Sequence, residues 1–325
     1  MYDAVAIGEL LIDFTPHGES VQGNALFERN PGGAPANVMA AVAKLGKRTA
    51  FIGKVGNDAF GLFLQETLKR SGVDPKGLVL NDEVNTTLAF VHLKEDGDRD
   101  FSFYRKPGAD LTLREDEVNY DLIGSAEAFH FGSVSMTGEP VRSVTLRAVE
   151  YAKRRGKLIS YDPNYREPLW ASPAMARTVI AEGLQYADLL KLSEDELAFL
   201  TGNGDCETGC ARLFEKYRIP MIFVTLGSKG CYYRVHGRSG WVPGFEAAAI
   251  DATGAGDAFL GAMLYQALEH PGRLLGLTDA EIRERVRFAN AAGALATQRK
   301  GAIPSLPELG EVRTLLRKDV GESTA

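Results

Sequence analysis

The chain has 325 residues, of which 45% are hydrophobic and 25% charged, and its formal net charge at pH 7 is −6. This size and composition are typical of a globular protein with one large α/β domain or two smaller ones. The acidic balance argues against nucleic acid as the main partner, because affinity for nucleic acid depends on Lys and Arg side chains that neutralise phosphates. Apolar runs are too short for a membrane span, so no membrane partner is expected.

The first residues contain no basic segment followed by an apolar run, so we expect no signal peptide. Cys206, Cys210 and Cys231 are too few, and odd in number, for a disulfide framework. Cys206 and Cys210 could share one helix face, but no second ligand pair accompanies them, which favours structural thiols over a zinc site. A cytoplasmic location is therefore expected.

The first predicted element is a buried strand over residues 3–13, an apolar run that ends in Asp13. Ligands gather at the carboxyl ends of strands in parallel α/β sheets, so Asp13 is either a cleft residue or a turn acid. Residues 31–37 then lead into apolar positions at helical spacing. Gly33 would let the backbone approach a ligand and Asn37 can donate and accept hydrogen bonds, although a plain helix-entry turn explains both equally well.

Two segments interrupt the alternation of strands and helices. Residues 14–30 are polar and contain glycine, and residues 84–104 have the pattern of a β-hairpin with a turn at 95–98. We interpret them as a small sheet outside the main one, which could be a lid over a site or a dimer surface. Arg105 follows the hairpin and could bind an anionic or hydroxyl-rich ligand, although most surface arginines are simply solvated.

The alternation then resumes, and polar residues follow the predicted strands. A strand over 157–161 runs into Asp162-Pro-Asn-Tyr-Arg166, which is typical of a site that holds a polar ligand. A strand over 189–192 precedes Ser193-Glu-Asp-Glu196. For that run a capping box is the favoured interpretation, and a contact from Glu196 to hydrated magnesium is the alternative.

Glycine turns follow in the second half of the chain. The strand over 220–226 leads into Gly227-Ser-Lys-Gly230, a candidate phosphate or nucleotide contact. An antiparallel hairpin beginning with 231–235 could form the edge of the sheet. Residues 282–296 are predicted to form a helix whose small side chains would permit close packing against a flat ligand or another helix.

The segment Asp251-Ala-Thr-Gly-Ala-Gly-Asp-Ala-Phe259 joins a glycine turn to a predicted amphipathic helix. Gly254 and Gly256 allow the backbone to come close to a ligand. Unpaired N–H groups and the positive end of the helix dipole would meet there, and this arrangement suits a phosphate. Asp257 at the helix start is either an N-cap or a general base beside this anion hole.

P-loop, dinucleotide-binding and metalloprotease motifs are absent from the sequence. The two glycine motifs, residues 31–37 and 251–259, stand in the order found in a known family. The chain resembles the ribokinase-like (PfkB) carbohydrate kinases over essentially its whole length. Residues 251–259 match that family's C-terminal signature and residues 31–46 its N-terminal signature. Within the family, residues 8–13, 103–110 and 162–170 are most similar to fructokinases.

The resemblance implies a fold and a set of roles. The fold would be one ribokinase-like three-layer α/β/α domain over residues 1–325, with a mostly parallel sheet and a β-sheet lid from about residues 14–30 and 84–106. Asp257 would be the catalytic base, beside an anion hole formed by the backbone of Gly254, Ala255 and Gly256. The substrate contacts that the resemblance implies are Asp13, Gly33, Asn37, Arg105, Asn164 and Arg166.

The same resemblance implies sites for nucleotide and metal. Gly227 and Asn290 would contact the nucleotide together with Gly254. Glu196 would organise Mg²⁺ through water, although Ser193 stands where the family motif has Asn. The candidates for a monovalent cation such as K⁺ are Asp251, Thr253 and Ser305.

These features predict an ATP- and Mg²⁺-dependent sugar kinase, with phosphorylation of D-fructose to fructose 6-phosphate as the first candidate and a homodimer formed through the lid. Kinases of 2-keto-3-deoxygluconate, ribose or nucleosides are alternatives within the class. A non-catalytic protein that binds sugar or nucleotide is the alternative from a different class.

Overall fold

The computed structural model describes residues 1–93, 99–269 and 276–322. Its main sheet has nine strands within these ranges, in the order β13-β12-β11-β10-β9-β8-β1-β4-β5. Neighbouring strands are parallel, except that β12 pairs antiparallel with both β11 and β13. The strands of this sheet are β1 (Tyr2–Ile7), β4 (Thr49–Gly56), β5 (Val73–Asn81), β8 (Ala126–Gly132), β9 (Leu158–Asp162), β10 (Leu189–Ser193), β11 (Met221–Thr225), β12 (Cys231–Val235) and β13 (Arg238–Val242).

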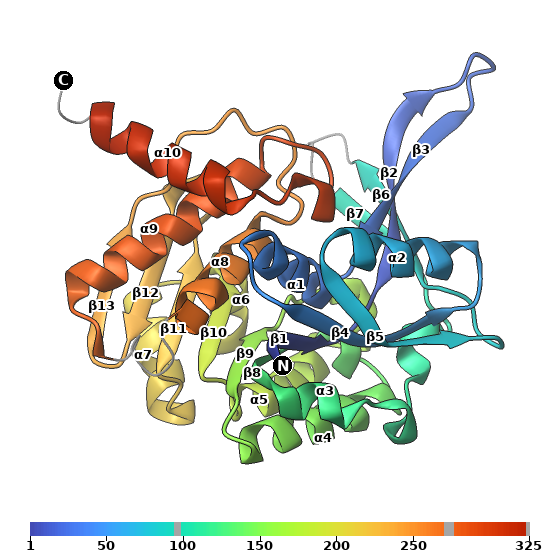
Figure 1. Ribbon diagram of the computed structural model, residues 1–325, viewed down its shortest axis with the longest axis horizontal. Helices are drawn as coiled ribbons and strands as arrows, with labels where there is room; N and C mark the ends of the chain where they lie inside the picture. The colour runs from blue at the N-terminus through green and yellow to red at the C-terminus, as the bar shows by residue number, and fades with distance from the viewer. Residues whose placement is uncertain (94–98, 270–275, 323–325) are drawn as a thin grey trace.

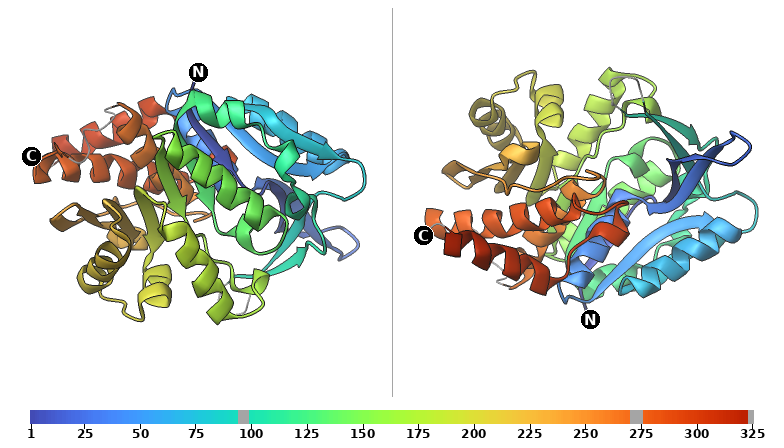
Figure 2. Two further views of the ribbon diagram at one scale, coloured as in Figure 1. Left: turned by 90° about the horizontal axis from the view of Figure 1, so that it is seen from below. Right: turned by 90° about the horizontal axis from the view of Figure 1, so that it is seen from above.

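Helices cover both faces of this sheet, so the predicted three-layer α/β/α arrangement is confirmed (Figures 1 and 2). One face carries α1 (Ala34–Lys44), α2 (Ala59–Arg70), α8 (Ala255–Glu269), α9 (Asp279–Ala296) and α10 (Leu309–Glu322). The other face carries α3 (Tyr120–Ser125), α4 (Val141–Arg154), α5 (Pro173–Leu184), α6 (Glu194–Thr201) and α7 (Cys206–Tyr217). None of these described helices is long and apolar enough to cross a membrane.

Burial on both faces explains why the central strands are continuous apolar runs. All eight residues of β4 are buried. In β11, Ile222 and Val224 belong to one core cluster, whereas Phe223 between them belongs to the other. This alternation is the geometry of a strand with helices above and below, and it makes the strand ends the places where polar groups can gather.

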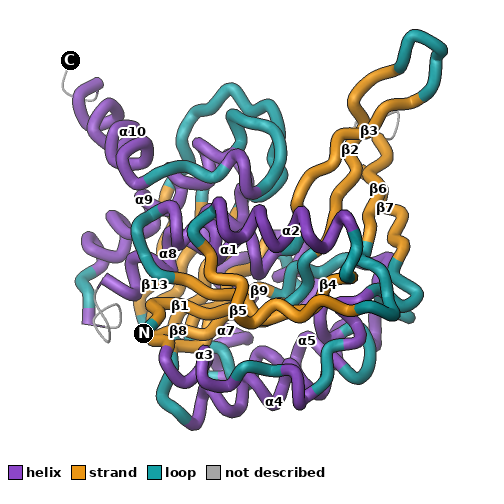
Figure 3. Tube along the Cα trace, turned by 45° about the vertical axis from the view of Figure 1, so that its right-hand side comes forward, coloured by secondary structure: helices purple, strands orange, loops and turns teal. Residues whose placement is uncertain are grey.

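A second, four-stranded sheet stands beside the main one, in the order β3-β2-β6-β7 among the described residues. It consists of β2 (Leu11–Glu19), β3 (Ala25–Gly32), β6 (Leu88–Leu93) and β7 (Arg99–Tyr104). The hairpin of β2 and β3 projects away from the body of the molecule (Figures 1 and 3). The rings of Phe14 on β2 and Phe60 on α2 pack edge to face, with their centroids 5.8 Å apart. This contact connects the second sheet to the main domain.

This second sheet confirms the small sheet predicted outside the main one, but one predicted strand is wrong. The expected strand over residues 3–13 is two strands in two different sheets, because β1 ends at Ile7 and β2 begins at Leu11. Asp13 is therefore the third residue of β2 rather than the end of a strand. An apolar run signals burial but does not say which sheet it joins. The predicted turn at 95–98 lies outside the described residues.

Helices α1 and α8 pack closely at Gly261. A β-carbon at Gly261 would lie only 2.5 Å from the β-carbon of Ala41, so the two helix backbones approach to a distance that no larger residue would allow. Asn37 lies one turn before Ala41, and Asp257 lies one turn before Gly261. The contact therefore sets the distance between the first turns of both helices.

We expect Gly261→Ala to lower the free energy of unfolding by about 1–3 kcal/mol, because the added methyl group overpacks the helix contact. Ala41→Gly in the same chain removes the colliding carbon and is expected to restore much of the loss. Urea unfolding of the two single variants and the double variant measures this coupling. Strictly additive effects of the two substitutions would contradict the contact.

Candidate active site

A cavity of about 890 Å³ opens at the carboxyl ends of the parallel strands and is bordered by the second sheet. This edge is where ligands bind in open α/β sheets. The backbone of Gly33, Gly254 and Gly256 forms part of its wall. The predicted site residues whose side chains line the cavity are Asp13, Asn37, Asn164, Arg166, Glu196, Thr253 and Asp257.

The first turn of α8 forms one side of the cavity. Gly254 has a φ of +79°, a conformation that other residues adopt at a cost, and its carbonyl accepts the first bond of the helix from the Ala258 N–H at 2.8 Å. The N–H groups of Gly256 and Asp257 belong to the first turn, where the helix provides no carbonyl acceptors. With the helix dipole, these groups make the turn a site for an anion.

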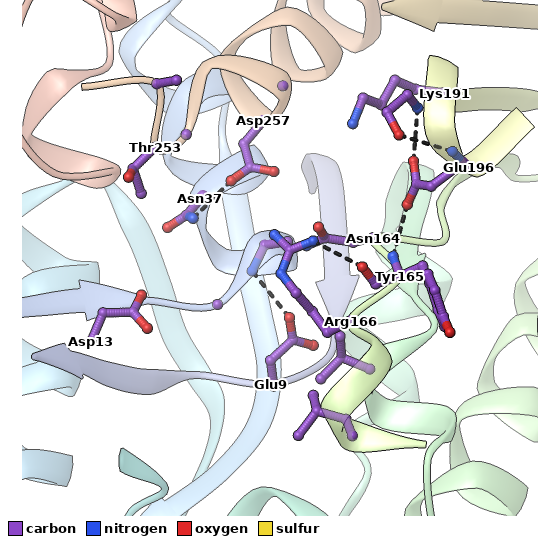
Figure 4. Close-up of a pocket in the computed structure, with 18 of the residues that line it drawn as sticks. Glu9, Asp13, Asn37, Asn164, Tyr165, Arg166, Lys191, Glu196, Thr253 and Asp257 are labelled. Atoms are coloured by element: carbon purple, nitrogen blue, oxygen red, sulfur yellow. Dashed lines mark hydrogen bonds between the residues drawn. The ribbon is translucent and has the colours of Figure 1, made fainter. Parts of the chain in front are cut away.

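Asp257 is the third residue of α8, so the alternative that it is the N-cap is wrong. Its Oδ2 accepts a hydrogen bond of 2.8 Å from Nδ2 of Asn37 on α1 (Figure 4). Burial raises the pKa of Asp257 to about 6, and the nearby Asp162 adds to this effect. The hydrogen bond from Asn37 and the positive charges of Lys191 and Arg166 lower the pKa, but they do not cancel the increase. A carboxylate with this pKa is ionised at neutral pH and can still accept a proton.

Asn37 also presents an acceptor to a ligand. Its Oδ1 is buried and has no hydrogen-bond partner among the residues that the structure describes. Buried amide oxygens are nearly always paired in folded proteins, since an unpaired one costs about 1–3 kcal/mol. A ligand hydroxyl that donates to Oδ1 would complete the bonding of this side chain.

Two further carboxyl groups lie on the side of the cavity formed by β2 and the loop after β1 (Figure 4). Desolvation, reinforced by Asp257 and opposed by Arg166, raises the pKa of Asp13 to about 7. Glu9 accepts a 3.1 Å hydrogen bond from the Ala34 N–H at the start of α1, and burial is the main cause that raises its pKa to about 7. Glu9 therefore holds the start of α1 beside the cavity.

Gly33 fits this arrangement tightly. Its φ is +118°, and a β-carbon there would lie 2.4 Å from the carbonyl oxygen of Glu9. Asn37 is anchored one turn later, because its N–H donates to the carbonyl of Gly33 at 2.9 Å. A larger residue at position 33 would displace the helix start that carries Asn37.

On the opposite side of the cavity, Glu196 is held by backbone. Its Oε1 accepts from the Tyr165 N–H and its Oε2 from the Ser193 N–H, both at 2.7 Å. Ser193 Oγ in turn accepts from the Glu196 N–H at 3.1 Å, so the predicted capping box is confirmed. Because Glu196 also faces the cavity, capping leaves it available to water in the site.

Sequence reasoning missed Lys191, which lies on β10 and also lines the cavity. Its ammonium donates to Oδ2 of Asp162 at 3.0 Å, and both side chains are buried. Burial disfavours the charged ammonium, but Asp162, Glu196 and Asp257 outweigh that effect and raise the pKa of Lys191 to about 12. The sequence signal that could have identified Lys191 is a charged residue inside an otherwise apolar predicted strand.

Several predicted site residues do not line this cavity. The Arg105 guanidinium is buried and donates to Asp110, to Thr137 and to the carbonyl of Val134. It therefore braces the segment after β7. Asn290 Nδ2 donates to the carbonyls of Val242 and Pro243 at 3.1 and 2.9 Å, and Gly227 lies exposed in a turn after β11.

The three candidates for a monovalent cation belong to two loops that meet beside α8. Asp251 Oδ1 accepts from the N–H and Oγ1 of Thr253, and its Oδ2 accepts from the Gly301 N–H at 2.9 Å. Ser305 is fully buried, and its hydroxyl donates to the Ala302 carbonyl. Within residues 1–93, 99–269 and 276–322, no cluster of three or more His, Cys, Asp or Glu side chains is suited to a metal ion.

Comparison with known proteins places these features in a family. Residues 1–309 match the model of the "pfkB family carbohydrate kinase". The chain is 46% identical over 316 residues to fructokinase-1 of Zea mays, covering 97% of both chains. It is also 46% identical over 314 residues to fructokinase-1 of Oryza sativa subsp. japonica, covering 96% of this chain and 97% of that one.

Solved structures give the same family. A fructokinase from Xylella fastidiosa with bound ATP superposes with a TM-score of 0.90 at 34% identity, covering 98% of this chain and 100% of that one. A fructokinase from Vibrio cholerae O395, with fructose, ADP and calcium ion bound, has a TM-score of 0.85 at 36% identity and covers 96% of this chain and 98% of that one.

We expect Asp13→Asn to stabilise the protein at pH 8. The raised pKa means that the folded state binds a proton more tightly than the unfolded state does. Stability from this group is therefore present at low pH and is lost as the pH rises towards about 7. The neutral amide removes that loss, so the melting temperature should rise at pH 8 and change little at pH 4. Asp121→Asn, on the exposed side of α3, is the control, and an equal shift at both pH values for Asp13→Asn would contradict the assignment.

For Ser193→Ala we expect a loss of about 0.5–2 kcal/mol in the free energy of unfolding, because the N–H group of Glu196 loses its acceptor. Ser193→Thr keeps a hydroxyl at the cap and should retain most of the stability. Urea unfolding compares the two variants. Equal stability of the alanine and threonine variants would mean that the cap contributes nothing.

Proposed function

The chain belongs to the pfkB family of carbohydrate kinases, and from that premise we propose that it is an ATP-dependent fructokinase that phosphorylates a terminal hydroxyl of D-fructose to give fructose 6-phosphate. The full-length similarity to fructokinases supports this assignment. The observation that carries it is the Asn37–Asp257 hydrogen bond at the first turn of α8, which holds a carboxylate next to N–H groups that can bind a phosphoryl group.

In the proposed reaction the sugar oxygen attacks the γ-phosphorus of ATP in line with the departing oxygen of ADP. The new O–P bond forms as the bond to ADP breaks, and the hydroxyl proton passes to Asp257. Proton transfer to a positioned base contributes roughly 10²–10⁴-fold in rate. The N–H groups of Gly254, Gly256 and Asp257 would stabilise charge on the transferring group, whereas the Ala255 N–H, predicted to share in this role, donates to the Ala252 carbonyl at 3.2 Å. Loss of one such donor typically costs about 10²–10³-fold.

The sugar is proposed to bind between the two helix starts and β2. Asp13 and Asn37 supply acceptors for hydroxyl groups, the backbone of Gly33 allows close approach, and Asn164 and Arg166 face the same cavity. Orientation by several hydrogen bonds would place one hydroxyl at Asp257 and keep the others away from it.

Mg²⁺ is proposed to accompany ATP. Glu196 fits this ion as a ligand through water, because its carboxylate faces the cavity and is fixed by two backbone N–H groups. This donor set suits Mg²⁺, which is usually held by few carboxylates, substrate phosphates and several waters. When bound, the ion neutralises charge on the phosphates.

K⁺ is proposed for the two loops that meet beside α8, with Asp251, Thr253 and Ser305 as the nearby oxygen-bearing residues. The hydrogen bond from the Gly301 N–H to Asp251 joins these loops. A cation there would reinforce the same connection and thereby the position of the glycine turn that follows.

We also propose that residues 1–325 act as one domain, with residues 14–30 and 84–106 as the lid over the cavity and as the surface of a homodimer. Phe103 on β7 lines the cavity, and this contact supports the proposed lid. Leu26, Phe27 and Tyr104 are exposed on it, and apolar exposure of this kind is typical of an interface. A cytoplasmic location is part of the same proposal.

One observation favours a second substrate. Arg166 presents a cation at the cavity, which suits the carboxylate of 2-keto-3-deoxygluconate. ADP release, measured with fructose, 2-keto-3-deoxygluconate, ribose and a nucleoside, separates these sugars. We expect the highest kcat/KM with fructose. Activity with 2-keto-3-deoxygluconate alone would mean that the protein is a kinase of this acidic sugar. If no sugar stimulates ADP release, the protein would be a non-catalytic protein that binds sugar or nucleotide.

Asp257→Asn is expected to lower kcat by at least about 10² while fructose binding stays nearly intact, because the amide keeps the shape of the side chain but cannot take the proton. Coupled assays give kcat, and calorimetry gives the dissociation constant for fructose. Asp121→Asn again provides the matched control, since Asp121 lies on the surface of α3. Near-normal turnover of Asp257→Asn would remove this residue from the mechanism.

A further inference from the structure

Lys191 is a buried cation that the scheme above leaves without a role. It lies on β10 between Leu190 and Leu192, which pack into a core cluster on one face of the sheet. Its own side chain extends toward the start of α8 (Figure 4). Strand β9 is the neighbour of β10, with Leu190 opposite Tyr161, and this register brings Asp162 next to Lys191. The hydrogen bond between them therefore follows from the sheet.

The ammonium group lies against the glycine turn of α8. A β-carbon at Gly256 would be only 2.9 Å from Nζ of Lys191, and it would meet no other atom so closely. Lys191, Gly256 and Asp257 all line the same cavity. The cation and the N–H groups of the first turn therefore converge on one place.

This position is unfavourable for a cation that serves only the fold. The start of a helix carries the positive end of its dipole, which stabilises anions and repels a lysine. A phosphoryl group between the helix start and Lys191 would turn this repulsion into two attractions. The arrangement is therefore the one expected around a bound anion.

Hydrogen bonding leads to the same conclusion. An ammonium group has three donors, and in the described part of the chain one of them is used, by Asp162. Glu196 is close enough to act on Lys191 electrostatically, but both its oxygens accept backbone N–H groups. Buried donors are costly to leave unpaired, and the cavity is where acceptors for the remaining donors can come from.

We propose that Lys191 is a catalytic residue that donates hydrogen bonds to the phosphoryl group during its transfer at the first turn of α8. This inference rests on the proposed kinase function. The sugar oxygen gains the bond to phosphorus, ADP keeps the electron pair of the bond that breaks, and Asp257 takes the hydroxyl proton. Lys191 stays protonated throughout and balances the negative charge on the phosphoryl oxygens.

The alternative is that Lys191 only neutralises Asp162, and a double-mutant cycle separates the two roles. Lys191→Met is expected to lower kcat by about 10²–10³, as for the loss of a transition-state donor. In a chain that already carries Asp162→Asn, no buried carboxylate at 162 needs a partner. We expect Lys191→Met to cause a similar loss there, measured against Asp162→Asn alone. If Lys191→Met has no effect in that background, the cation serves only Asp162 and the proposal is overturned.

The double variant also protects the test against misfolding. Breaking a buried ion pair on one side can unfold a protein, whereas replacing both partners with neutral groups is often tolerated. Circular dichroism and the dissociation constant for fructose establish that each variant is folded. If Lys191→Met alone does not fold, the comparison of kcat between Asp162→Asn and the double variant still distinguishes the two roles of Lys191.

A binding measurement distinguishes failure of this inference from failure of the proposed function. Beryllium fluoride with ADP mimics the γ-phosphoryl group and needs no sugar. Lys191→Met should weaken binding of this mixture about tenfold or more and leave the affinity for ADP alone nearly unchanged. Equal loss for both ligands, or no loss for either, would contradict contact with the phosphoryl group, whether or not the wild-type protein phosphorylates fructose.

Discussion

The hydrogen bond between Asn37 and Asp257 is the interaction on which the site depends. It joins residues 220 positions apart in the sequence and connects the first turns of α1 and α8. One turn further along, Gly261 and Ala41 bring the same two helices into close contact. The packing fixes how far apart the helix starts lie, and the hydrogen bond fixes the direction of the carboxylate between them. A sugar hydroxyl and a phosphoryl group could both reach that carboxylate.

The carboxyl groups near this hydrogen bond lower the stability of the folded protein. Glu9, Asp13 and Asp257 have raised pKa values because the cavity withdraws them from water. Each therefore makes the folded state less favourable at neutral pH than a neutral residue would. The cost is tolerated because two core clusters bury apolar side chains on both faces of the sheet. A scaffold of this size can carry a charged, desolvated site that a small domain could not.

The sequence predicted the parts of this site whose signals are local. Glycine turns that precede amphipathic helices identified Gly33, Asn37 and Gly254, and the capping box at Ser193 was recognisable from four residues. What depends on the arrangement of strands was not predictable. In the sequence Lys191 is one residue of an apolar strand, and its pairing with Asp162 depends on β9 lying beside β10.

The limits of local patterns also explain the errors. The run over residues 3–13 is apolar throughout most of its length, but the structure divides it between two sheets, since hydrophobicity does not encode the partner of a strand. Arg105 stands near the predicted lid in the sequence, yet its guanidinium turns inward to Asp110. Family resemblance supplied roles for such positions, whereas the direction of each side chain depends on tertiary contacts such as the Arg105–Asp110 hydrogen bond.

The central claim is that a phosphoryl group and a sugar hydroxyl meet between the first turn of α8 and Asp257. The most direct measurement is a crystal structure with ADP, aluminium fluoride and fructose. We expect the fluoride group within hydrogen-bond distance of the backbone N–H groups of residues 254–257, and a terminal fructose hydroxyl at a carboxylate oxygen of Asp257. A phosphoryl mimic bound elsewhere in the cavity, or a fructose with no hydroxyl at Asp257, would contradict the account.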